Sequence, residues 1–298
     1  MRVSSRAGFG SAAVALAVLG AVGISGATPA SAAPAGWEVL SGISLSDSVA
    51  VKTVELHCPT GKVVSGGEAW LTASPGAVGR VGLERYAPSA DGKTWTVVMR
   101  ETGATNYTGD WQISARAFCV TTPSGYEVVA ADKTGTNDYH RMQITAQCSG
   151  TKKLLGSGAM VYNTDGAFIL DRVEAGFNDP TEIPFYTIAR ARTLDQGKVA
   201  HSQEDLRAYA ICANKPAALE RVRGLSDMVS PSMQNVPVAC PAGKEPYSVG
   251  AGIHVSSIHE NNRAQVLISG MRSSNAWAHE DPDGYVEDWR LSATLICG

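Results

Sequence analysis

Polar and apolar residues alternate along several stretches of this 298-residue chain, as in "KTVELHC" (52–58) and "WQISARAFC" (111–119). A third stretch, "TWTVVMR" (94–100), is rich in β-branched and aromatic residues. A period of two is typical of strands with one buried face, because successive side chains point to opposite sides. Gly, Pro, Asn and Asp gather between these runs, as in "PSADGKT" (88–94). The pattern predicts an all-β protein.

One stretch departs from this pattern. The segment "PAALERVRGLSDM" (216–228) has the local propensity of a helix. It occupies a place in the chain that corresponds to "GWEVLSG" (36–42), which has the composition of a strand. We give the correspondence more weight than the propensity and expect a strand.

The correspondence belongs to an internal repeat. The phrases "CPTGK" (58–62) and "CPAGK" (240–244) are nearly identical, and "CSGTK" (148–152) stands between them. A Glu precedes the cysteine of each phrase by 20, 21 and 20 residues, and each copy closes on a strand with an alanine four residues before its last cysteine. The positions are Glu38, Glu127 and Glu220, and Ala115, Ala208 and Ala293.

Matched offsets of this kind predict three homologous copies, at 36–122, 125–214 and 217–298, with five or six strands in each. We expect three disulfide-closed antiparallel units of about 85 residues, arranged as tandem small β-sandwich-like domains. The alternative is a single β-prism with pseudo-threefold symmetry. In either arrangement, the glycines that follow the first cysteine of each copy (Gly67, Gly158 and Gly252) indicate bulges or close approach of two backbones.

Six cysteines fall into three pairs, one in each copy. Because homologous copies are expected to be bridged alike, the predicted disulfides are Cys58–Cys119, Cys148–Cys212 and Cys240–Cys297. Loops of this length correspond to about 4 kcal/mol of stabilisation each in the chain-entropy model. Metal binding by the cysteines is disfavoured because the chain has no C-x-x-C pair.

The N-terminus predicts export. Arg2 and Arg6 precede an apolar run that ends in a small-residue sequence, "ASA" (30–32), and this order is typical of a secretory signal peptide over residues 1–32. A second long apolar run is absent from the sequence, so we expect no membrane span and a secreted, extracellular protein.

Charge disfavours two classes of partner. Residues 1–32 contain two arginines and no acidic residue, so their removal changes the formal net charge from −3 to −5. Lysines and arginines do not cluster along the sequence. A nucleic acid or an anionic membrane is therefore not an expected partner.

Together the phrases "GYEVV", "CPAGK" and "AYAIC" resemble a pattern common in small secreted proteins of actinobacterial type. The resemblance covers nearly the whole chain after residue 32, although the middle copy lacks the proline, and it implies export and a disulfide-closed β unit but no activity. Three disulfide-linked β repeats that open on "CP.G" also resemble vitelline membrane outer layer protein I. That second resemblance implies a β-prism with lectin-like architecture.

The sequence contains no catalytic motif that is complete. "HENNR" (259–263) lacks the second histidine of a zinc-protease helix, and "SGTK" (149–152) lacks the partner motifs of a serine acyltransferase. The acidic stretch "HEDPDGYVED" (279–288) is consistent with either a solvated turn or a calcium loop. We therefore expect no cofactor and no catalytic residue, and we leave calcium binding by residues 280–288 open.

Aromatic residues suggest where a ligand could bind. Those that recur between copies (Trp37 and Tyr126; Trp95, Tyr186 and Trp277; Trp111 and Trp289) are expected in the core. Trp70 and Tyr107 have no aromatic counterpart in the other copies, which makes them the candidate ligand contacts.

These observations favour a secreted, non-enzymatic protein that binds a carbohydrate, a cell-envelope polymer or an extracellular protein through its repeated β units. Two alternatives are an inhibitor of secreted hydrolases, with "ETGATNYTGD" (101–110) as the presented loop, and an extracellular hydrolase with a site between units.

Overall fold

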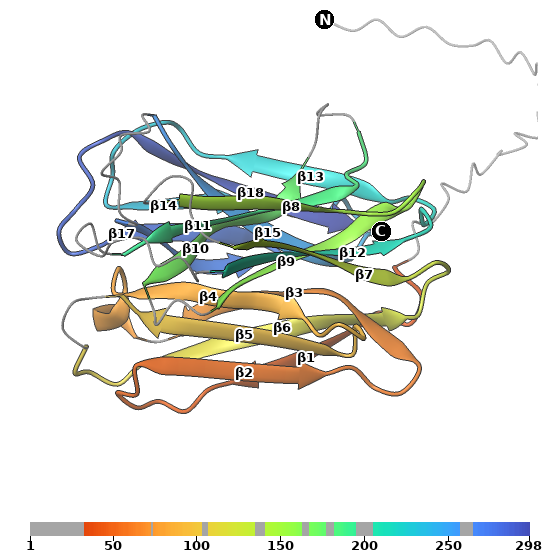
Figure 1. Cartoon of the computed structure of the whole chain (residues 1–298), viewed down its shortest axis with the longest axis horizontal. Helices are drawn as coiled ribbons and strands as arrows, with labels where there is room; N and C mark the ends of the chain where they lie inside the picture. The colour runs from red at the N-terminus through yellow and green to blue at the C-terminus, as the bar shows by residue number, and fades with distance from the viewer. Residues whose placement is uncertain are drawn as a thin grey trace, which may run out of the picture. The chain divides into compact units, whose positions relative to one another are not determined.

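A computed structural model describes residues 33–72, 74–102, 107–134, 141–162, 167–176, 182–194, 205–256 and 265–298. The predicted signal peptide lies outside the described residues. Residues 33–298 fall within one compact unit, shown as labelled strands in Figure 1. Among the residues that the structure describes, no helix has the length and apolar content needed to cross a membrane.

The all-β prediction is confirmed. Residues 36–122 form β1 (Glu38–Ile43), β2 (Val51–His57), β3 (Lys62–Thr72), β4 (Val81–Pro88), β5 (Thr94–Glu101) and β6 (Gln112–Thr121), with one 3-10 turn at Pro75–Ala77. Residues 125–214 form β7 (Glu127–Thr134), β8 (Arg141–Gln147), β9 (Lys153–Tyr162), β10 (Phe168–Gly176), β11 (Tyr186–Thr193) and β12 (Asp205–Ala213). Residues 217–298 form β13 (Glu220–Leu225), β14 (Met233–Pro237), β15 (Pro246–Val255), β16 (Val266–Arg272), β17 (Asn275–Glu280) and β18 (Trp289–Cys297).

The helix-like segment at 216–228 contains strand β13, as expected from its place in the chain. Its residues pair with β18 from Glu220, opposite Cys297, to Leu225, opposite Ser292. The ladder of hydrogen bonds with β18 outweighs the helix propensity of six residues, since propensity differences are only tenths of a kcal/mol per residue.

Strand pairing follows the same scheme in the three segments. The first and third strands flank the sixth, and the second and fourth strands flank the fifth. All of these pairs are antiparallel. Each segment thus contributes two three-stranded halves, and the six strands per segment agree with the number expected from the sequence.

The halves of different segments join into continuous sheets. Strand β4 pairs with β9, β10 pairs with β15, and β16 pairs with β3, so the fourth strand of each segment meets the third strand of the next in a cycle. One sheet has the order β1-β6-β3-β16-β17-β14, and the remaining twelve strands form a second sheet through one residue pair, Leu170 with Leu83. The expectation of separate tandem domains is therefore wrong, because every segment completes a sheet begun by another.

The six cysteines pair as predicted. The bridges are Cys58–Cys119, Cys148–Cys212 and Cys240–Cys297, and no cysteine is free. Each bridge ties the turn before the third strand to the sixth strand of the same segment.

The repeated "CPTGK" phrase has a structural explanation. Lys62, Lys152 and Lys244 each form an ion pair with the recurring glutamate of the first strand, at N–O distances of 2.5, 2.6 and 2.5 Å. The turn before each lysine contains a glycine with positive φ, at Gly61, Gly150 and Gly243. Because these pairs are partly exposed, each contributes only about 0–1 kcal/mol, and the turn geometry is the stronger constraint.

The predicted bulges after the first cysteine are present, but the three glycines named from the sequence do not occupy equivalent positions. Register shifts occur between Val64 and Gly66 on β3, at the β9–β12 pair and between Pro246 and Ser248 on β15. Gly67, Gly158 and Gly252 lie opposite Ala117, Tyr209 and Ser292, which are not equivalent positions of the sixth strand. The equivalent residues are Ala69, Ala159 and Ala251, each opposite one of the recurring alanines Ala115, Ala208 and Ala293.

Glycine and serine let three backbones approach closely in the interior. A Cβ atom on Gly156 of β9 would lie 1.9 Å from the carbonyl oxygen of Ser65 on β3, and one on Gly66 would lie 2.4 Å from the Cβ of Ser248 on β15. The Ser65 hydroxyl donates to the carbonyl oxygen of Tyr247, at 2.8 Å. Residues of all three segments thus meet at one point, which we call the triple contact (Ser65, Gly66, Gly156, Tyr247 and Ser248).

The large core side chains are only partly those expected. Trp95, Trp111 and Trp289 are fully buried, and Trp95 packs edge-on against Tyr86 with ring centroids 4.6 Å apart. Trp37 and Tyr126 pack on the core from its margin. Tyr186 and Trp277 are partly exposed and lie outside the core, so the prediction is wrong for these two.

Candidate functional site

Trp70 lies near the end of β3, at the junction where β3 pairs with β16. Its partner across the junction is Gly270, and the partner of Gly270 on the next strand is Trp277 of β17. A Cβ on Gly270 would lie 2.2 Å from the six-membered ring of Trp277, so this indole covers the glycine. Trp70 and Trp277 are both partly exposed. The row therefore presents two tryptophans on one side of the sheet, with a glycine as the residue between them.

Two arginines surround Trp70. The guanidinium carbon of Arg116 on β6 is 5.3 Å from the centroid of the Trp70 ring, and that of Arg272 on β16 is 4.9 Å away. Glu68, two residues before Trp70 on β3, is fully buried. We call this group the tryptophan face (Glu68, Trp70, Arg116, Arg272 and Trp277). Cations this close to an indole are attracted by the ring quadrupole and hold it in place.

Glu68 organises one side of the tryptophan face. Its Oε2 accepts a hydrogen bond from Arg116 Nη1 at 3.2 Å, and its Oε1 accepts one from the backbone N–H of Ser273 at 2.6 Å. Ser273 belongs to the turn between β16 and β17, so the carboxylate joins strands of two segments. A buried carboxylate requires such partners because its desolvation is costly.

The other two junctions carry different chemistry at the same positions. At the β9–β4 junction, the residues that correspond to Trp70 and Gly270 are Met160 and Arg85. At the β15–β10 junction, they are Gly252 and Arg172. The positions that correspond to Trp277 are Val98 and Arg190. Two tryptophans therefore occur at one junction only, which argues for one binding surface rather than three copies of it.

Tyr107, the second predicted ligand contact, is placed elsewhere. Its hydroxyl lies over Gly76 and Gly109, where an added Cβ would be 2.3 and 2.4 Å away. Its backbone N–H donates to Glu101, whose other carboxylate oxygen accepts from the indole of Trp111. The contacts of Tyr107 thus fix a loop onto the core, and none of these residues belongs to the tryptophan face.

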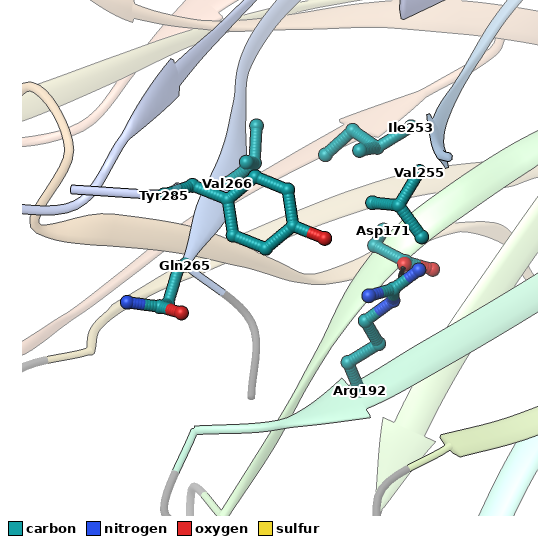
Figure 2. Close-up of a pocket in the computed structure, with 7 residues that line it drawn as sticks. All are labelled: Asp171, Arg192, Ile253, Val255, Gln265, Val266 and Tyr285. Carbon is teal, nitrogen blue, oxygen red and sulfur yellow. Dashed lines mark ion pairs between the residues drawn. The ribbon is translucent and has the colours of Figure 1, made fainter. Parts of the chain in front are cut away.

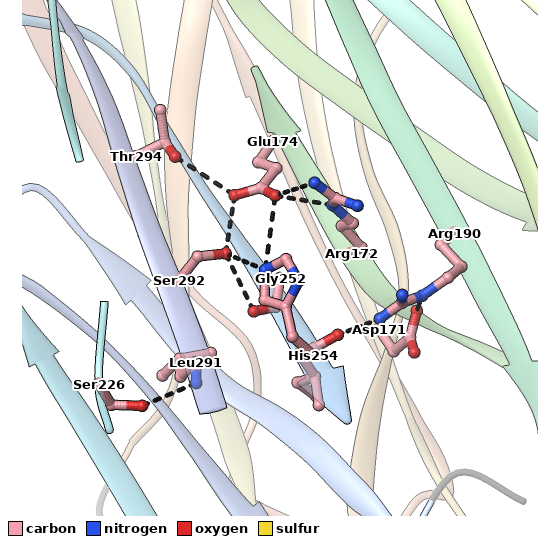
Figure 3. Close-up of polar contacts among 11 residues, drawn as sticks. Asp171, Arg172, Glu174, Arg190, Ser226, Gly252, His254, Leu291, Ser292 and Thr294 are labelled. Carbon is pink, nitrogen blue, oxygen red and sulfur yellow. Dashed lines mark hydrogen bonds and ion pairs between the residues drawn. The ribbon is translucent and has the colours of Figure 1, made fainter. Parts of the chain in front are cut away.

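A buried polar cluster contains the three residue types of a hydrolytic triad. Glu174 on β10 is fully buried and accepts hydrogen bonds from Arg172, Ser292 and Thr294, as Figure 3 shows. His254 Nε2 lies 2.9 Å from the Ser292 hydroxyl oxygen and 3.8 Å from Glu174 Oε1.

The geometry of this cluster is that of a packed polar core. In a catalytic triad the histidine stands between the serine and the acid and uses both ring nitrogens. Here Ser292 stands between His254 and Glu174, and the same histidine nitrogen faces both. Ser292 is also fully buried and bonded to the carbonyl oxygen of Gly252. The arrangement satisfies a buried carboxylate and leaves no accessible nucleophile.

The protonation of this cluster has a clear direction. Burial lowers the pKa of His254 from 6.5 to about 4, against the attraction of Glu174 and with repulsion from Arg172, Arg190 and Arg223. Burial alone would raise the pKa of Glu174, but Arg172 and the Ser292 hydroxyl hold it below its usual value. At neutral pH the cluster therefore contains a neutral histidine and an ionised glutamate.

We expect His254→Gln to flatten the pH dependence of stability. The unfolded chain binds a proton near pH 6.5 and the folded protein only near pH 4, so acidification through this interval favours the unfolded chain. Between pH 7 and pH 5 this histidine is expected to cost the folded protein about 2 kcal/mol. Urea denaturation at several pH values measures the slope in both proteins.

The control for this experiment is His57→Gln, because His57 is exposed. It should retain the wild-type slope. Equal slopes for His254→Gln and wild type between pH 7 and pH 5 would contradict the assignment. Because pH 5 to pH 7 lies above the ordinary pKa of a glutamate, Glu174 contributes little to the change in stability between these two pH values.

One small hollow lies beside Asp171 and Arg192 (Figure 2). Its wall also includes Ile253, Gln265 and Tyr285, and about 200 Å³ of it is free of atoms. Asp171 is ion-paired with both Arg190 and Arg192, at 2.6 and 2.5 Å. Burial would raise the pKa of Asp171, but the two arginines hold it below its usual range. The atom-free space of the hollow includes open solvent, so the hollow encloses little room for an organic ligand.

The acidic stretch at 280–288 forms a turn with internal partners. Glu280 Oε1 accepts from the Trp289 indole at 3.1 Å, and Asp281 Oδ1 accepts from the backbone N–H of Asp283 at 3.1 Å. Among the described residues, acidic, histidine and cysteine side chains nowhere gather in threes as a metal ion would need. "HENNR" (259–263) lies outside the described residues, as do residues 103–106 of the expected inhibitory loop.

Comparison with known proteins adds no assignment. A scan against models of protein families gives no match, and a search of the curated proteins gives none either. The functional argument therefore depends on the residues of this chain.

Sequence reasoning identified Trp70 but missed the rest of the tryptophan face. Arg116, Arg272 and Trp277 are distant from Trp70 in sequence, and strand register alone brings them together. The available signal was Gly270, because a lone glycine inside a strand often marks a place where a neighbouring group lies close to the backbone.

Proposed function

We propose that this protein is a non-enzymatic carbohydrate-binding protein that acts outside the cell and binds its ligand at the tryptophan face. The observation that carries the proposal is the row Trp70, Gly270 and Trp277 across three adjacent strands. Sugar rings present apolar C–H groups that pack on aromatic rings, while their hydroxyl groups seek hydrogen bonds at the edges.

The surroundings of the row favour a long ligand over a small one. The row lies on the face of a sheet, whereas the small hollow beside Asp171 offers little space for an organic molecule. A polymer can lie across the row of aromatic residues and contact both rings. Arg116 provides a polar group at the margin.

Action outside the cell is supported by three observations. The chain has six cysteines, all paired in disulfides, and such bridges persist in oxidising compartments. The sequence of residues 1–32 has the order of a signal peptide. The third observation is the resemblance to small secreted β-repeat proteins, which agrees with the disulfides and with the signal-peptide sequence.

We expect Trp277→Ala to weaken carbohydrate binding by about tenfold or more, which corresponds to roughly 1.4 kcal/mol. Because the ring lies outside the core, stability should change by less than about 1 kcal/mol. The mature protein and the variant are compared in depletion assays with insoluble polysaccharides of defined composition, and in titrations with soluble fragments of those that bind.

Tyr186→Ala is the matched control, since Tyr186 is a partly exposed aromatic residue on a different hairpin. It should bind as the wild type does. Wild-type affinity in folded Trp277→Ala would refute the placement of the site, and failure of the wild type to bind any carbohydrate would refute the function.

A further inference from the structure

The tryptophan face has an uneven distribution of charge. It contains two arginines and one glutamate, and both oxygens of that glutamate already have partners, Arg116 and the N–H of Ser273. Arg272 contacts the Trp70 ring, and its Nε is buried with no hydrogen-bond partner among the described residues. In the part of the chain that the structure describes, Arg272 also has no ion-pair partner.

Other strand arginines of this protein differ from Arg272 in this respect. Arg172 is ion-paired with Glu174 at 2.6 Å, and Arg190 with Asp171 at 2.6 Å. Arg207 binds both carboxylate oxygens of Asp132, at 2.6 and 2.9 Å. Arg85 and Arg290 share with Arg272 a buried Nε that has no hydrogen-bond partner among the described residues, but of these three Arg272 is the one that contacts a tryptophan ring.

Resting on the proposed function, we propose that the carbohydrate bound at the tryptophan face carries carboxylate groups, and that Arg272 binds one of them. A guanidinium offers parallel N–H groups that match the two oxygens of a carboxylate. Arg272 lies over the Trp70 ring, 4.9 Å from its centroid, so its charge is within the row of aromatic residues that a sugar would contact. Ring and charge together select an acidic sugar over a neutral one.

The position of Glu68 also limits the ligand. This buried carboxylate lies on the strand next to Arg272, so the face has an excess of one positive charge. The one positive charge that Glu68 does not balance would be neutralised by one carboxylate of the bound sugar. Ligands with denser negative charge, such as highly sulfated polymers, would approach Glu68 at an electrostatic cost.

The test compares two polymers that differ in the carboxylate alone. Polygalacturonate and its fully methyl-esterified form share one backbone, and binding of each to the mature protein is measured by titration at low and high salt. We expect the wild type to bind polygalacturonate at least tenfold more tightly than the ester at low salt, and the difference to shrink as salt is added. Arg272→Gln should bind both polymers equally, at the level of the ester.

Arg80→Gln is the matched control, because Arg80 is exposed and the substitution removes the same charge. It should keep the wild-type preference. Circular dichroism and urea denaturation establish that Arg272→Gln is folded.

Three results would overturn the inference. They are equal wild-type affinity for the two polymers, an undiminished preference in Arg272→Gln, and tighter binding of dextran sulfate than of polygalacturonate. Wild-type binding of neutral polymers as tight as that of polygalacturonate, lost in Trp277→Ala, would leave the proposed function standing while refuting the acidic ligand. Absence of binding to every carbohydrate would refute both.

Discussion

Gly156→Ala is expected to destabilise the protein by at least about 3 kcal/mol, the upper part of the range for overpacked cores. The new Cβ would lie 1.9 Å from the carbonyl oxygen of Ser65. That oxygen belongs to the backbone and cannot rotate away as the tip of a side chain would. Ser65 is also held by hydrogen bonds from its hydroxyl to Phe118 and Tyr247, at 3.2 and 2.8 Å. Relief of the clash would therefore displace strands of more than one segment.

Urea denaturation followed by tryptophan fluorescence measures this effect. The matched control is Gly150→Asn in the turn before β9, where a Cβ meets nothing within 4 Å and φ is +57°. Asparagine tolerates that conformation, so the control should lose less than about 1 kcal/mol. A Gly156→Ala protein with the urea midpoint of wild type would show that the triple contact is not as tight as described.

The second large effect is expected from removal of a disulfide. In Cys148→Ala/Cys212→Ala the bridge across 64 residues is lost, and the chain-entropy model gives a loss of about 4 kcal/mol in the free energy of unfolding. Both cysteines are buried, so alanine also leaves small cavities that add to the loss.

A double variant at Cys240 and Cys297 provides the comparison, since its loop of 57 residues is nearly as long. The two variants should differ by only about 0.1 kcal/mol on entropic grounds. A loss below about 1 kcal/mol in either one would contradict the chain-entropy estimate, because it would mean that the disulfide restricts the unfolded chain little. Wild type with reduced and alkylated cysteines should be less stable than both variants.

The sequence predicted what depends on local pattern. Alternation of residues gave the all-β class, and the matched phrases gave the disulfides and the strand at Glu220–Leu225. These features depend on side-chain period and on spacing within one segment, both of which can be read from the letters.

Register across segments could not be read in this way. Gly67, Gly158 and Gly252 stand 9, 10 and 12 residues after the first cysteine of their copies and do not correspond in space, whereas Ala69, Ala159 and Ala251, each 11 residues after it, do. Trp277 lies over Gly270 at the position that corresponds to Val98, whereas Trp95 stands three residues earlier on its own strand and is buried in the core. Two residues that match in an alignment of letters can thus have opposite environments.

Contacts between charged side chains could not be predicted from the sequence for a related reason. The arginines are dispersed along the sequence, yet Arg116 and Arg272 meet at Trp70, although 156 positions separate them in the numbering. Lysines and arginines that do not cluster along the sequence can therefore still meet in space, as these two arginines do. Contacts between distant strands depend on the order of strands in the sheet, which local pattern does not determine.

The cyclic pairing of β4 with β9, β10 with β15 and β16 with β3 has an evolutionary consequence. A gene that lost one copy by recombination would encode a chain whose remaining sheet halves have the wrong number of partners, and an isolated copy would expose two open edges. Unlike solenoid arrays, which grow or shrink by whole modules, this architecture fixes its copy number at three once the ring is closed.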